Sequence, residues 1–184
     1  LHKEYRRQRQ MSIRDRSSAN RVGIDRLEQM ITALSAERYG NAIDQLNGYG
    51  RAVAEAGVRR IPDGRYCFED VMDSDGHAAA NCTIKVAITV ADAAVQVDFT
   101  GTSSAVPGNI NCPLSVTAAG VFYVIRCLLP PETPACAGAF DVVTIQATPG
   151  CLVHAQRPAA TAAGNVATSM RIVDCMLGAR AEAL

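Results

Sequence analysis

The sequence predicts an α+β protein in which a helical N-terminal segment precedes an antiparallel sheet with packed helices. Three observations lead to this prediction. Apolar residues recur at helical spacing through the first 60 residues. Two runs after residue 80 alternate apolar and polar side chains with a period of two. An apolar run of about four helical turns then lies between Pro113 and Pro130.

The N-terminal stripes are narrow and amphipathic. The first covers residues 24–34, with Ser17 and Ser18 as candidate N-caps and Gly40 as its predicted end. A second, weaker stripe covers residues 43–53. Each helix is therefore expected to cover another surface with one face only.

The sheet is predicted from alternation and turn residues. A Pro-Asp-Gly turn at residues 62–64 opens this part of the chain. Strands are predicted for the following ranges: 66–71, 82–90, 95–99, 142–147 and a short one at 151–153. The short link between the second and third makes them a hairpin.

Two helices complete the prediction. Residues 114–129 carry few charges before Arg126, so they predict a nearly buried helix. A final helix begins at Asn165, and its predicted inner face is formed by Val166, Met170, Val173 and Leu177.

The charged residues are distributed unevenly between the two halves of the chain. Its net charge is zero, but residues 1–60 hold 12 Lys and Arg against 7 Asp and Glu, whereas residues 61–184 hold 6 against 11. We treat 1–60 as a basic helical segment that contacts another subunit or domain, and 61–184 as the α+β core. A basic cluster could touch nucleic acid, but a solvated helix face or an acidic protein partner explains it better, and no nucleic-acid partner is predicted.

Composition indicates the cellular compartment in which the protein works. Seven cysteines without a C-x-x-C pair indicate buried thiols in a reducing compartment rather than a zinc site or disulfides. No apolar run is long enough to span a bilayer, and no signal peptide opens the chain. We expect a cytoplasmic protein without membrane contact.

The first candidate site is the loop Gly108-Asn109-Ile110-Asn111. It precedes the predicted apolar helix, and helix starts present free N–H groups that can hold a carbonyl or an anion. Asn109 and Asn111 could offer their amides to one ligand. Ordinary turn chemistry of asparagine is the alternative.

The second candidate site opens the last helix. Gly164 permits close backbone approach, Asn165 can cap, and Thr168 lies in the first turn. Arg171 could pair with an anionic substrate or with an acidic residue such as Asp98. Capping alone would also explain this segment. The central hypothesis is that both openings converge on a common cavity walled by the helix after Pro113.

Other reactive side chains are weaker candidates. Asp98 could act as a general base or orient a partner group, or it could be a surface aspartate. Cys112 precedes a helix but has no evident histidine partner, which favours a structural thiol. The acidic turn around His77 lacks calcium-loop spacing and is expected to be solvated, so no metal ligands are predicted.

Four segments in order carry a resemblance to a known family: IPDGRYCFEDVMD, VDFTGTS, GNIN and GNVATSMRIVD. Their order and spacing resemble the hydantoinase B/oxoprolinase family, which includes the B-type polypeptide of N-methylhydantoinase, the second half of 5-oxoprolinase, and acetone and acetophenone carboxylase subunits. The resemblance extends from Ser18 to the last helix. Family members are longer, so the chain is expected to be a fragment of a larger subunit.

The resemblance implies a function. It predicts part of the B-type subunit of an ATP-dependent enzyme that opens cyclic amides, with a ketone carboxylase or a non-catalytic assembly module as alternatives. ATP and Mg would be bound by a partner A-type subunit, in agreement with the absence of phosphate-binding motifs here. A divalent metal would be held by an upstream segment absent from this chain, none would be bound by this chain alone, and activity would require the hetero-oligomer.

The resemblance also suggests residue roles. Asp98 and Asn165 would act in catalysis, while Asn109, Asn111, Gly164, Thr168 and Arg171 would bind substrate. Ala167 and Met170 stand where the family usually has a glutamate and a glutamine. These apolar replacements favour a less polar substrate, such as a ketone.

Overall fold

The computed structural model describes residues 2–77 and 80–181. It falls into two compact units, Leu1–Leu46 and Asn47–Leu184. The boundary lies inside the second helix, α2 (Ala36–Val58), and not at residue 61, where the character of the sequence changes. Neither long helix, nor any other in the described ranges, is apolar enough over sufficient length to cross a membrane.

The first unit is helical, as predicted, but its helix boundaries differ. α1 (His2–Leu34) includes Ser17 and Ser18, the serines predicted as N-caps, in its interior. It ends where Ser35 adopts a φ of 68°, a left-handed conformation that cannot continue a right-handed helix. The Ser35 hydroxyl then accepts a hydrogen bond from the backbone N–H of Arg38 at 3.4 Å, at the start of α2. Gly40, the predicted end, lies inside α2.

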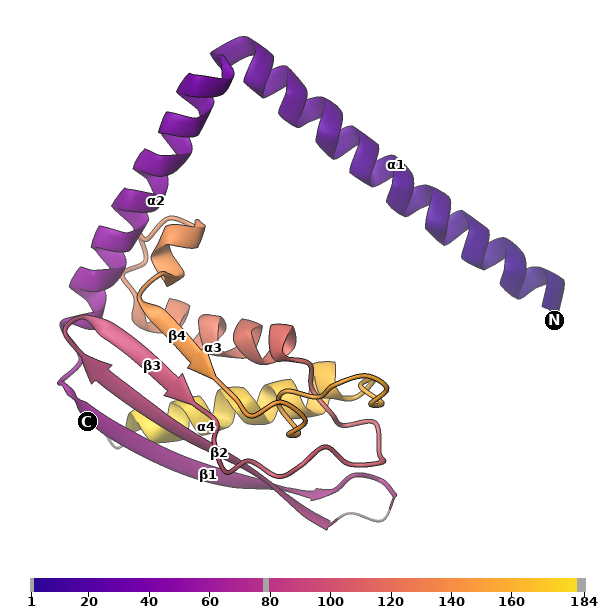
Figure 1. The fold of residues 1–184 in the computed structure, drawn as a ribbon, viewed down its shortest axis with the longest axis vertical. Helices are drawn as coiled ribbons and strands as arrows, with labels where there is room; N and C mark the ends of the chain where they lie inside the picture. The colour runs from indigo at the N-terminus through magenta and orange to yellow at the C-terminus, as the bar shows by residue number, and fades with distance from the viewer. Residues whose placement is uncertain (1, 78–79, 182–184) are drawn as a thin grey trace. The chain divides into compact units, whose positions relative to one another are not determined.

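The second unit is built on a four-stranded sheet in the order β1-β2-β3-β4 (Figure 1). The strands are β1 (Gly64–Ser74), β2 (Ala80–Ala91), β3 (Ala94–Asp98) and β4 (Val143–Gln146). β2 and β3 form the predicted hairpin, and its two turn residues, Asp92 and Ala93, have φ values of 51° and 63°. This is the backbone twist that a two-residue hairpin turn requires.

One strand departs from the predicted antiparallel pattern. β4 pairs with β3 in parallel, with Val95 opposite Val143. A parallel neighbour needs a long crossover, and the chain between β3 and β4 supplies it with α3 (Leu114–Leu128). The sheet is therefore mixed. The short strand predicted at 151–153 is reduced to a single bridge between Ser104 and Cys151.

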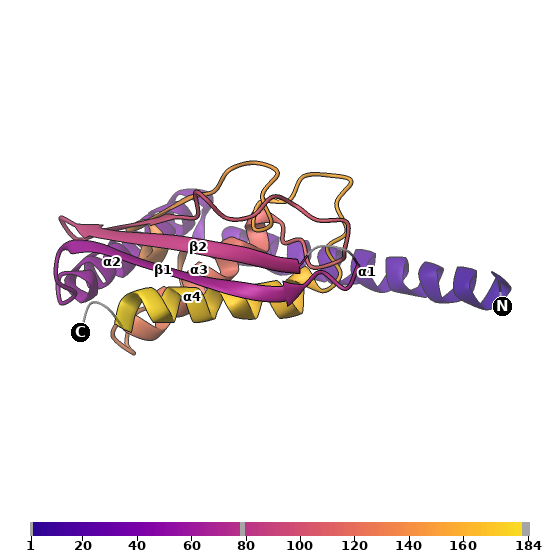
Figure 2. The same cartoon turned by 90° about the horizontal axis from the view of Figure 1, so that it is seen from below.

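Helices α3 and α4 (Ser169–Ala181) cover one face of the sheet (Figure 2). Alternate β2 side chains point into this layer and share one apolar cluster with the two helices and β3. Its members include Ile84, Ile88, Val95, Val97, Val121, Val124, Ile172 and Met176. The opposite face of β2 carries Thr83, Lys85 and Thr89, which are exposed or half-buried. The period-two alternation predicted for β2 therefore corresponds to one face packed against the helices and one open face, in a two-layer α+β unit.

The predicted inner face of the last helix is wrong for three of its four residues, while the fourth, Val173, is half-buried and packs against the core. The residues that α4 buries are Ile172, Cys175, Met176 and Ala179, whereas Val166, Met170 and Leu177 are 62%, 65% and 47% exposed. Both sets have helical spacing, so periodicity alone could not choose between them. α3 is likewise not nearly buried, because Ser115, Ala119, Tyr123 and Cys127 form an exposed stripe along it.

The second half of α2 belongs to the sheet-containing unit. Most of the residues that it buries are small: Gly50, Ala54 and Gly57. The Asn47 side chain accepts a hydrogen bond at 3.1 Å from the backbone N–H of Gly138, in the short 3-10 helix η1 (Ala137–Phe140). Arg51 pairs with Asp141 just beyond it. A Cβ on Gly138 would lie 2.6 Å from the carbonyl carbon of Asn47, so this contact requires glycine.

We therefore expect Gly138→Ala to destabilise the chain by about 1–3 kcal/mol, because backbone must move to relieve the clash. The matched control is Gly48→Ala in the same stretch of α2, where an added Cβ meets nothing within 4 Å. It should be neutral or stabilising by about 0.5–1 kcal/mol, the usual gain for Gly→Ala inside a helix. Urea unfolding of both variants measures the difference, and equal midpoints would contradict the packing described.

Candidate functional site

The two segments predicted as site openings lie against each other, although some 50 residues separate them in the sequence. The backbone N–H of Ala163 donates to the carbonyl of Asn109 at 2.9 Å. The Thr168 hydroxyl donates to the carbonyl of Ile110. A Cβ on Gly164 would lie 2.7 Å from the carbonyl carbon of Asn111. The openings thus meet by direct backbone packing.

The second opening is a π-turn, η2 (Gly164–Thr168), continuous with α4. The carbonyl of Ala163 accepts the N–H groups of both Val166, at 3.0 Å, and Ala167, at 2.7 Å. Asn165, Val166 and Ala167 are all exposed, between buried Gly164 and buried Thr168. Single π-turns occur often at functional sites, and here the turn presents three consecutive side chains outward.

Asn111 organises the first opening from inside. Its side chain is 0% exposed. Its oxygen accepts the N–H of Val106 at 2.8 Å, and its nitrogen donates to the carbonyls of Val106 and Gly108 at 2.8 Å and of Ala160 at 2.9 Å. Every polar atom of the amide is therefore engaged within the chain. Direct contact with a ligand stays a prediction for this residue.

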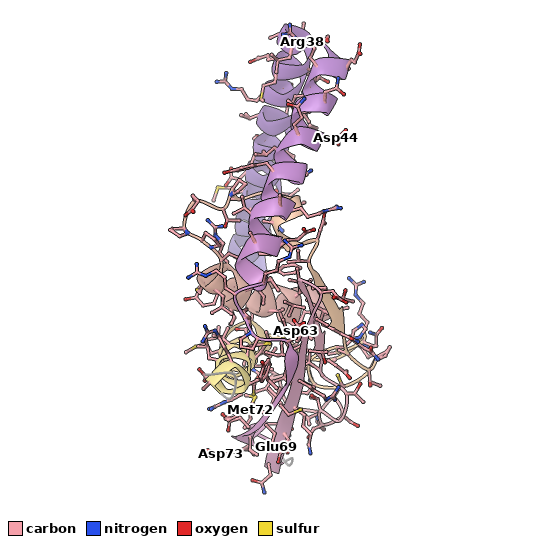
Figure 3. The ribbon with its side chains drawn as sticks, turned by 90° about the vertical axis from the view of Figure 1, so that its left-hand side faces the viewer. Arg38, Asp44, Asp63, Glu69, Met72 and Asp73 are labelled. Carbon is pink, nitrogen blue, oxygen red and sulfur yellow. The ribbon has the colours of Figure 1, made fainter. Side chains whose placement is uncertain are left out.

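Asn109 and Thr168 take different positions around this junction. The Asn109 side chain is exposed, while its backbone carbonyl receives Ala163. Thr168 is 0% exposed, and besides Ile110 it contacts the sulfur of Met72 on β1 at 3.5 Å. Met72 is labelled in Figure 3, on the strand beside α4. Thr168 therefore ties the loop, the π-turn and the sheet together.

Asn165 is the predicted site residue that faces an open groove. This groove, of about 460 Å³, runs between α3 and the start of α4. Its lining residues are Val116, Ala119, Gly120, Tyr123, Asn165, Ser169, Met170, Val173 and Asp174. Asn111 does not line it, so the two asparagines meet at one junction without sharing a cavity. The predicted helix after Pro113 does supply one wall.

Arg171 pairs with an acidic residue, which was one of the two predicted alternatives, but this residue is Asp70 and not Asp98. Its guanidinium donates to Asp70 on β1 at 2.6 Å, with Asp174 at 3.8 Å. The proposed pairing with Asp98 is not present. The backbone N–H of Val71 and the guanidinium of Arg171 both bond to the Asp70 carboxylate and lower its pKa from the ordinary value of 3.8. The pair joins α4 to the edge of the sheet.

Asp98 lies apart from this junction, at the end of β3. Its carboxylate accepts the N–H of Thr100 at 2.8 Å. It lines a shallow depression on the open face of the sheet together with Arg65 and Lys85. None of the residues lining this depression lines the groove beside Asn165. Nothing in this arrangement brings Asp98 to the other candidate site residues.

Asp75 is a structural residue of the site that sequence reasoning missed. The acidic turn was expected to be solvated, but Asp75 is only 3% exposed. One carboxylate oxygen accepts the N–H of Gly108 at 2.9 Å and the other that of His77 at 2.8 Å. A Cβ on Gly108 would lie 2.7 Å from that of Asp75. The Asp-Gly pair in this turn was the available signal.

Cys112 behaves as the structural thiol that the sequence favoured. It is 0% exposed, and burial raises its pKa despite a hydrogen bond from Thr117. A raised pKa keeps the thiol protonated and unreactive. Across residues 2–77 and 80–181, no three His, Cys, Asp or Glu side chains gather in a way that could hold a metal ion.

The junction generates a first prediction, for Gly164→Ala. The added methyl group would overlap the Asn111 carbonyl, so the two openings must separate. We expect a loss of about 1–3 kcal/mol in unfolding free energy. Faster hydrogen exchange at the Ala163 amide, which bonds to Asn109, should accompany it. Exchange as slow as in the native chain would show that the contact is not required.

A second prediction concerns Asp70 and pH. Because the folded-state pKa is lowered, the contribution of this carboxylate is present above its ordinary pKa of 3.8 and is lost as pH falls through the lower folded value. Asp70→Asn should therefore cost less than about 1 kcal/mol near neutral pH, given the partial exposure of the pair. The difference from the native chain should vanish in acid. Thermal unfolding between acid and neutral pH measures this, and a pH-independent difference would refute the assignment.

Comparison with known proteins identifies the family. A model of the hydantoinase B/oxoprolinase family matches residues 4–184. The 5-oxoprolinase 1 of Arabidopsis thaliana is 30% identical in an alignment 177 residues long that covers 88% of this chain and 14% of that protein. A protein of Pseudomonas sp. (strain NS671) assigned as the B-type subunit of a D-/L-hydantoinase is 29% identical in an alignment 157 residues long that covers 79% of this chain and 26% of that protein.

Two solved structures share the fold. The ATP-dependent caprolactamase of Pseudomonas jessenii superposes with a TM-score of 0.75 at 21% identity, over 91% of this chain and 30% of that chain. Nucleotide-free acetone carboxylase gives a TM-score of 0.57 at 16% identity, over 76% of this chain and 20% of that chain. The chain thus spans between 14% and 30% of the length of these four relatives. With the family model covering nearly every residue, and with the four segments in their expected order, this chain belongs to the hydantoinase B/oxoprolinase family.

Proposed function

We propose that the chain is part of the B-type polypeptide of an ATP-dependent enzyme that opens the ring of a cyclic amide. The observation that carries this proposal is the junction of the Asn109–Asn111 loop with the π-turn, which presents Asn165 to a groove lined by polar Ser169 and Asp174 as well as by apolar side chains. Family membership supports the reaction class, since the relatives include proteins named as a 5-oxoprolinase, a hydantoinase and a caprolactamase.

The groove suits a small ring with one polar edge. Asn165 and Ser169 line one part of it, and Tyr123, Met170 and Val173 supply apolar contacts. The ring methylenes would lie on the apolar side chains while the amide carbonyl faces Asn165. An N–H donor held at that position stabilises the negative charge that develops on the carbonyl oxygen during C–N cleavage.

This geometry assigns roles to the other site residues. Gly164 and Thr168 are buried and would position the π-turn, and Asn111 would do the same for the loop. The Asn109 side chain is exposed but does not line the groove, so its contact with a substrate carbonyl stays a prediction. Arg171 is committed to Asp70, so it would orient α4 instead of binding an anion. Asp98, on the open sheet face, lies outside the proposed site.

We propose that ATP and Mg²⁺ are held outside this chain. It contains no glycine-rich phosphate loop, and its described acidic and histidine side chains form no metal-binding group. We therefore assign nucleotide and Mg²⁺ to an A-type partner subunit, and the divalent metal implied by the family to other B-type segments. The chain alone would be inactive.

A ketone carboxylase is the second candidate. Met170, which lines the groove, is apolar where the family resemblance implies a glutamine, and this makes the groove more suitable for an apolar ketone. Ala167, exposed on the neighbouring π-turn, is likewise apolar where a glutamate is usual. The fold shared with acetone carboxylase is compatible with this. An assembly role for the N-terminal unit is a third candidate, favoured by an exposed apolar stripe on α1 that includes Ile24, Leu27, Met30 and Leu34.

The test is Asn165→Ala in the assembled A- and B-type complex, assayed with 5-oxoproline, hydantoin, caprolactam and acetone. We expect a loss of roughly 10²–10³-fold in kcat, the usual cost of one oxyanion donor. Thermal unfolding should not change, because Asn165 is exposed. Gln96→Ala, on the open sheet face, is the control. Unchanged turnover of all four compounds would refute the proposal, and the compound that is turned over separates hydrolase from carboxylase.

A further inference from the structure

The groove beside Asn165 carries a negative charge that the proposed reaction does not use. Among the described residues that line it, Asp174 is the one with a charged side chain, and this side chain is 57% exposed. An exposed aspartate carboxylate is an anion at neutral pH. A molecule in the groove therefore meets a fixed negative charge on α4.

Arg171 does not neutralise this charge. Its guanidinium lies 3.8 Å from the Asp174 carboxylate but makes its short bond, of 2.6 Å, to Asp70. Arg171 also does not line the groove. One guanidinium is thus set against two carboxylates, and its closer partner faces away from the substrate site on β1. The cluster keeps an excess negative charge, and Asp174 is the member that the groove exposes.

The backbone of the π-turn offers an anion little compensation. Helix starts hold anions through N–H groups that lack a partner within the helix. Here the N–H groups of Val166 and Ala167 bond to the carbonyl of Ala163, and that of Ser169 bonds to the carbonyls of Gly164 and Val166. These three donors are used inside the turn, so they are not available to a carboxylate in the groove.

Ser169 is likewise an acceptor for a ligand and not a donor. Its hydroxyl donates to the carbonyl of Asn165 at 2.9 Å and lies 3.2 Å from that of Val166. A hydroxyl has one proton, so the oxygen can only accept a further hydrogen bond. Asn165 and Ser169 together offer a side-chain N–H donor and an oxygen acceptor. They match the C=O and N–H of a ring amide, which is neutral.

We propose that Asp174 is a specificity-determining residue of this groove, which favours ring amides that are neutral or carry a cationic substituent over those that bear a carboxylate. The inference rests on the proposed function, because it takes the groove as the substrate site. It goes further by excluding one class of substrate. A carboxylate on the ring would approach Asp174 as a like charge, whereas an ammonium group would be attracted to it.

The inference separates this chain from one of the relatives it resembles. The protein of Arabidopsis thaliana at 30% identity is named as a 5-oxoprolinase, and 5-oxoproline is a ring amide that bears a carboxylate. The groove described here provides Asp174 where such a substrate needs a cation. We therefore expect 5-oxoproline to be a poor substrate and its neutral amide, 5-oxoprolinamide, to be a better one.

The test compares these two compounds, which share one ring and differ in the charge of one substituent. The ratio of kcat/KM for 5-oxoprolinamide to that for 5-oxoproline is measured in the assembled complex. Asp174→Asn should lower this ratio about fivefold, the effect of one exposed charge pair in water, and Asp174→Lys should lower it further. Both effects should shrink as salt is added. Asp92→Asn, at an exposed turn whose φ of 51° asparagine also adopts, removes the same charge elsewhere and should leave the ratio unchanged.

Binding to the full 184-residue chain, followed by NMR, gives a readout that does not need turnover. We expect 5-oxoprolinamide to shift the amide signals of Asn165, Met170 and Asp174 at lower concentration than 5-oxoproline does, and Asp174→Asn to reduce this difference. The inference is overturned if the native chain prefers 5-oxoproline in both measurements, if the preference is the same in Asp174→Asn, or if Asp92→Asn changes it equally.

The two proposals can fail separately. Loss of turnover in Asn165→Ala with a ratio that does not respond to Asp174 would support the reaction and overturn the charge selectivity. Absence of turnover for every ring amide, with the NMR preference still dependent on Asp174, would overturn the reaction and support the selectivity.

Discussion

The junction between the Asn109–Asn111 loop and the π-turn is the contact on which the rest of the site depends. It is made by main chain against main chain: the Ala163 amide bonds to Asn109, and Gly164 packs on the carbonyl of Asn111. A side chain at residue 164 would hold the two segments apart. The outward position of Asn165, the burial of Thr168 and the start of α4 all follow from this approach.

Three buried polar side chains stabilise the junction by hydrogen bonds to its backbone. Asn111 bonds to the loop and to the carbonyl of Ala160, Asp75 bonds to the amide of Gly108, and Thr168 bonds to Ile110. Groups of this kind are costly to bury unless every donor and acceptor has a partner. Because these partners are almost all backbone atoms, the network fixes the path of the chain and not just the side chains.

The sequence predicted the elements well where the pattern was unambiguous. The hairpin of β2 and β3 alternates cleanly and has a short link, and its structure is as predicted. The two openings meet, as hypothesised from the glycine and asparagine before each helix, but they do not share the common cavity that was expected, because only Asn165 lines the groove. The α+β class and the family were likewise accessible from residue patterns.

Other features could not be derived from local patterns. α4 carries two apolar sets at helical spacing, and only tertiary packing decides that Met176 is buried and Met170 is not. β4 pairs in parallel because the chain crosses over through α3 before it reaches β4. The residues of β4 themselves do not indicate the direction of pairing. The partner of Arg171 was missed because Asp70 lies about 100 residues earlier, on a strand whose register was unknown.

The distance along the chain between Asn109 and Ala163 has a further consequence. No short stretch of the polypeptide contains both halves of the junction, because α3 and β4 lie between them in the sequence. Closing a contact of this separation costs chain entropy, and contacts of large separation slow the folding of a domain. A compound that recognises the completed junction binds only to the finished fold, and by mass action it shifts the population away from partly assembled chains.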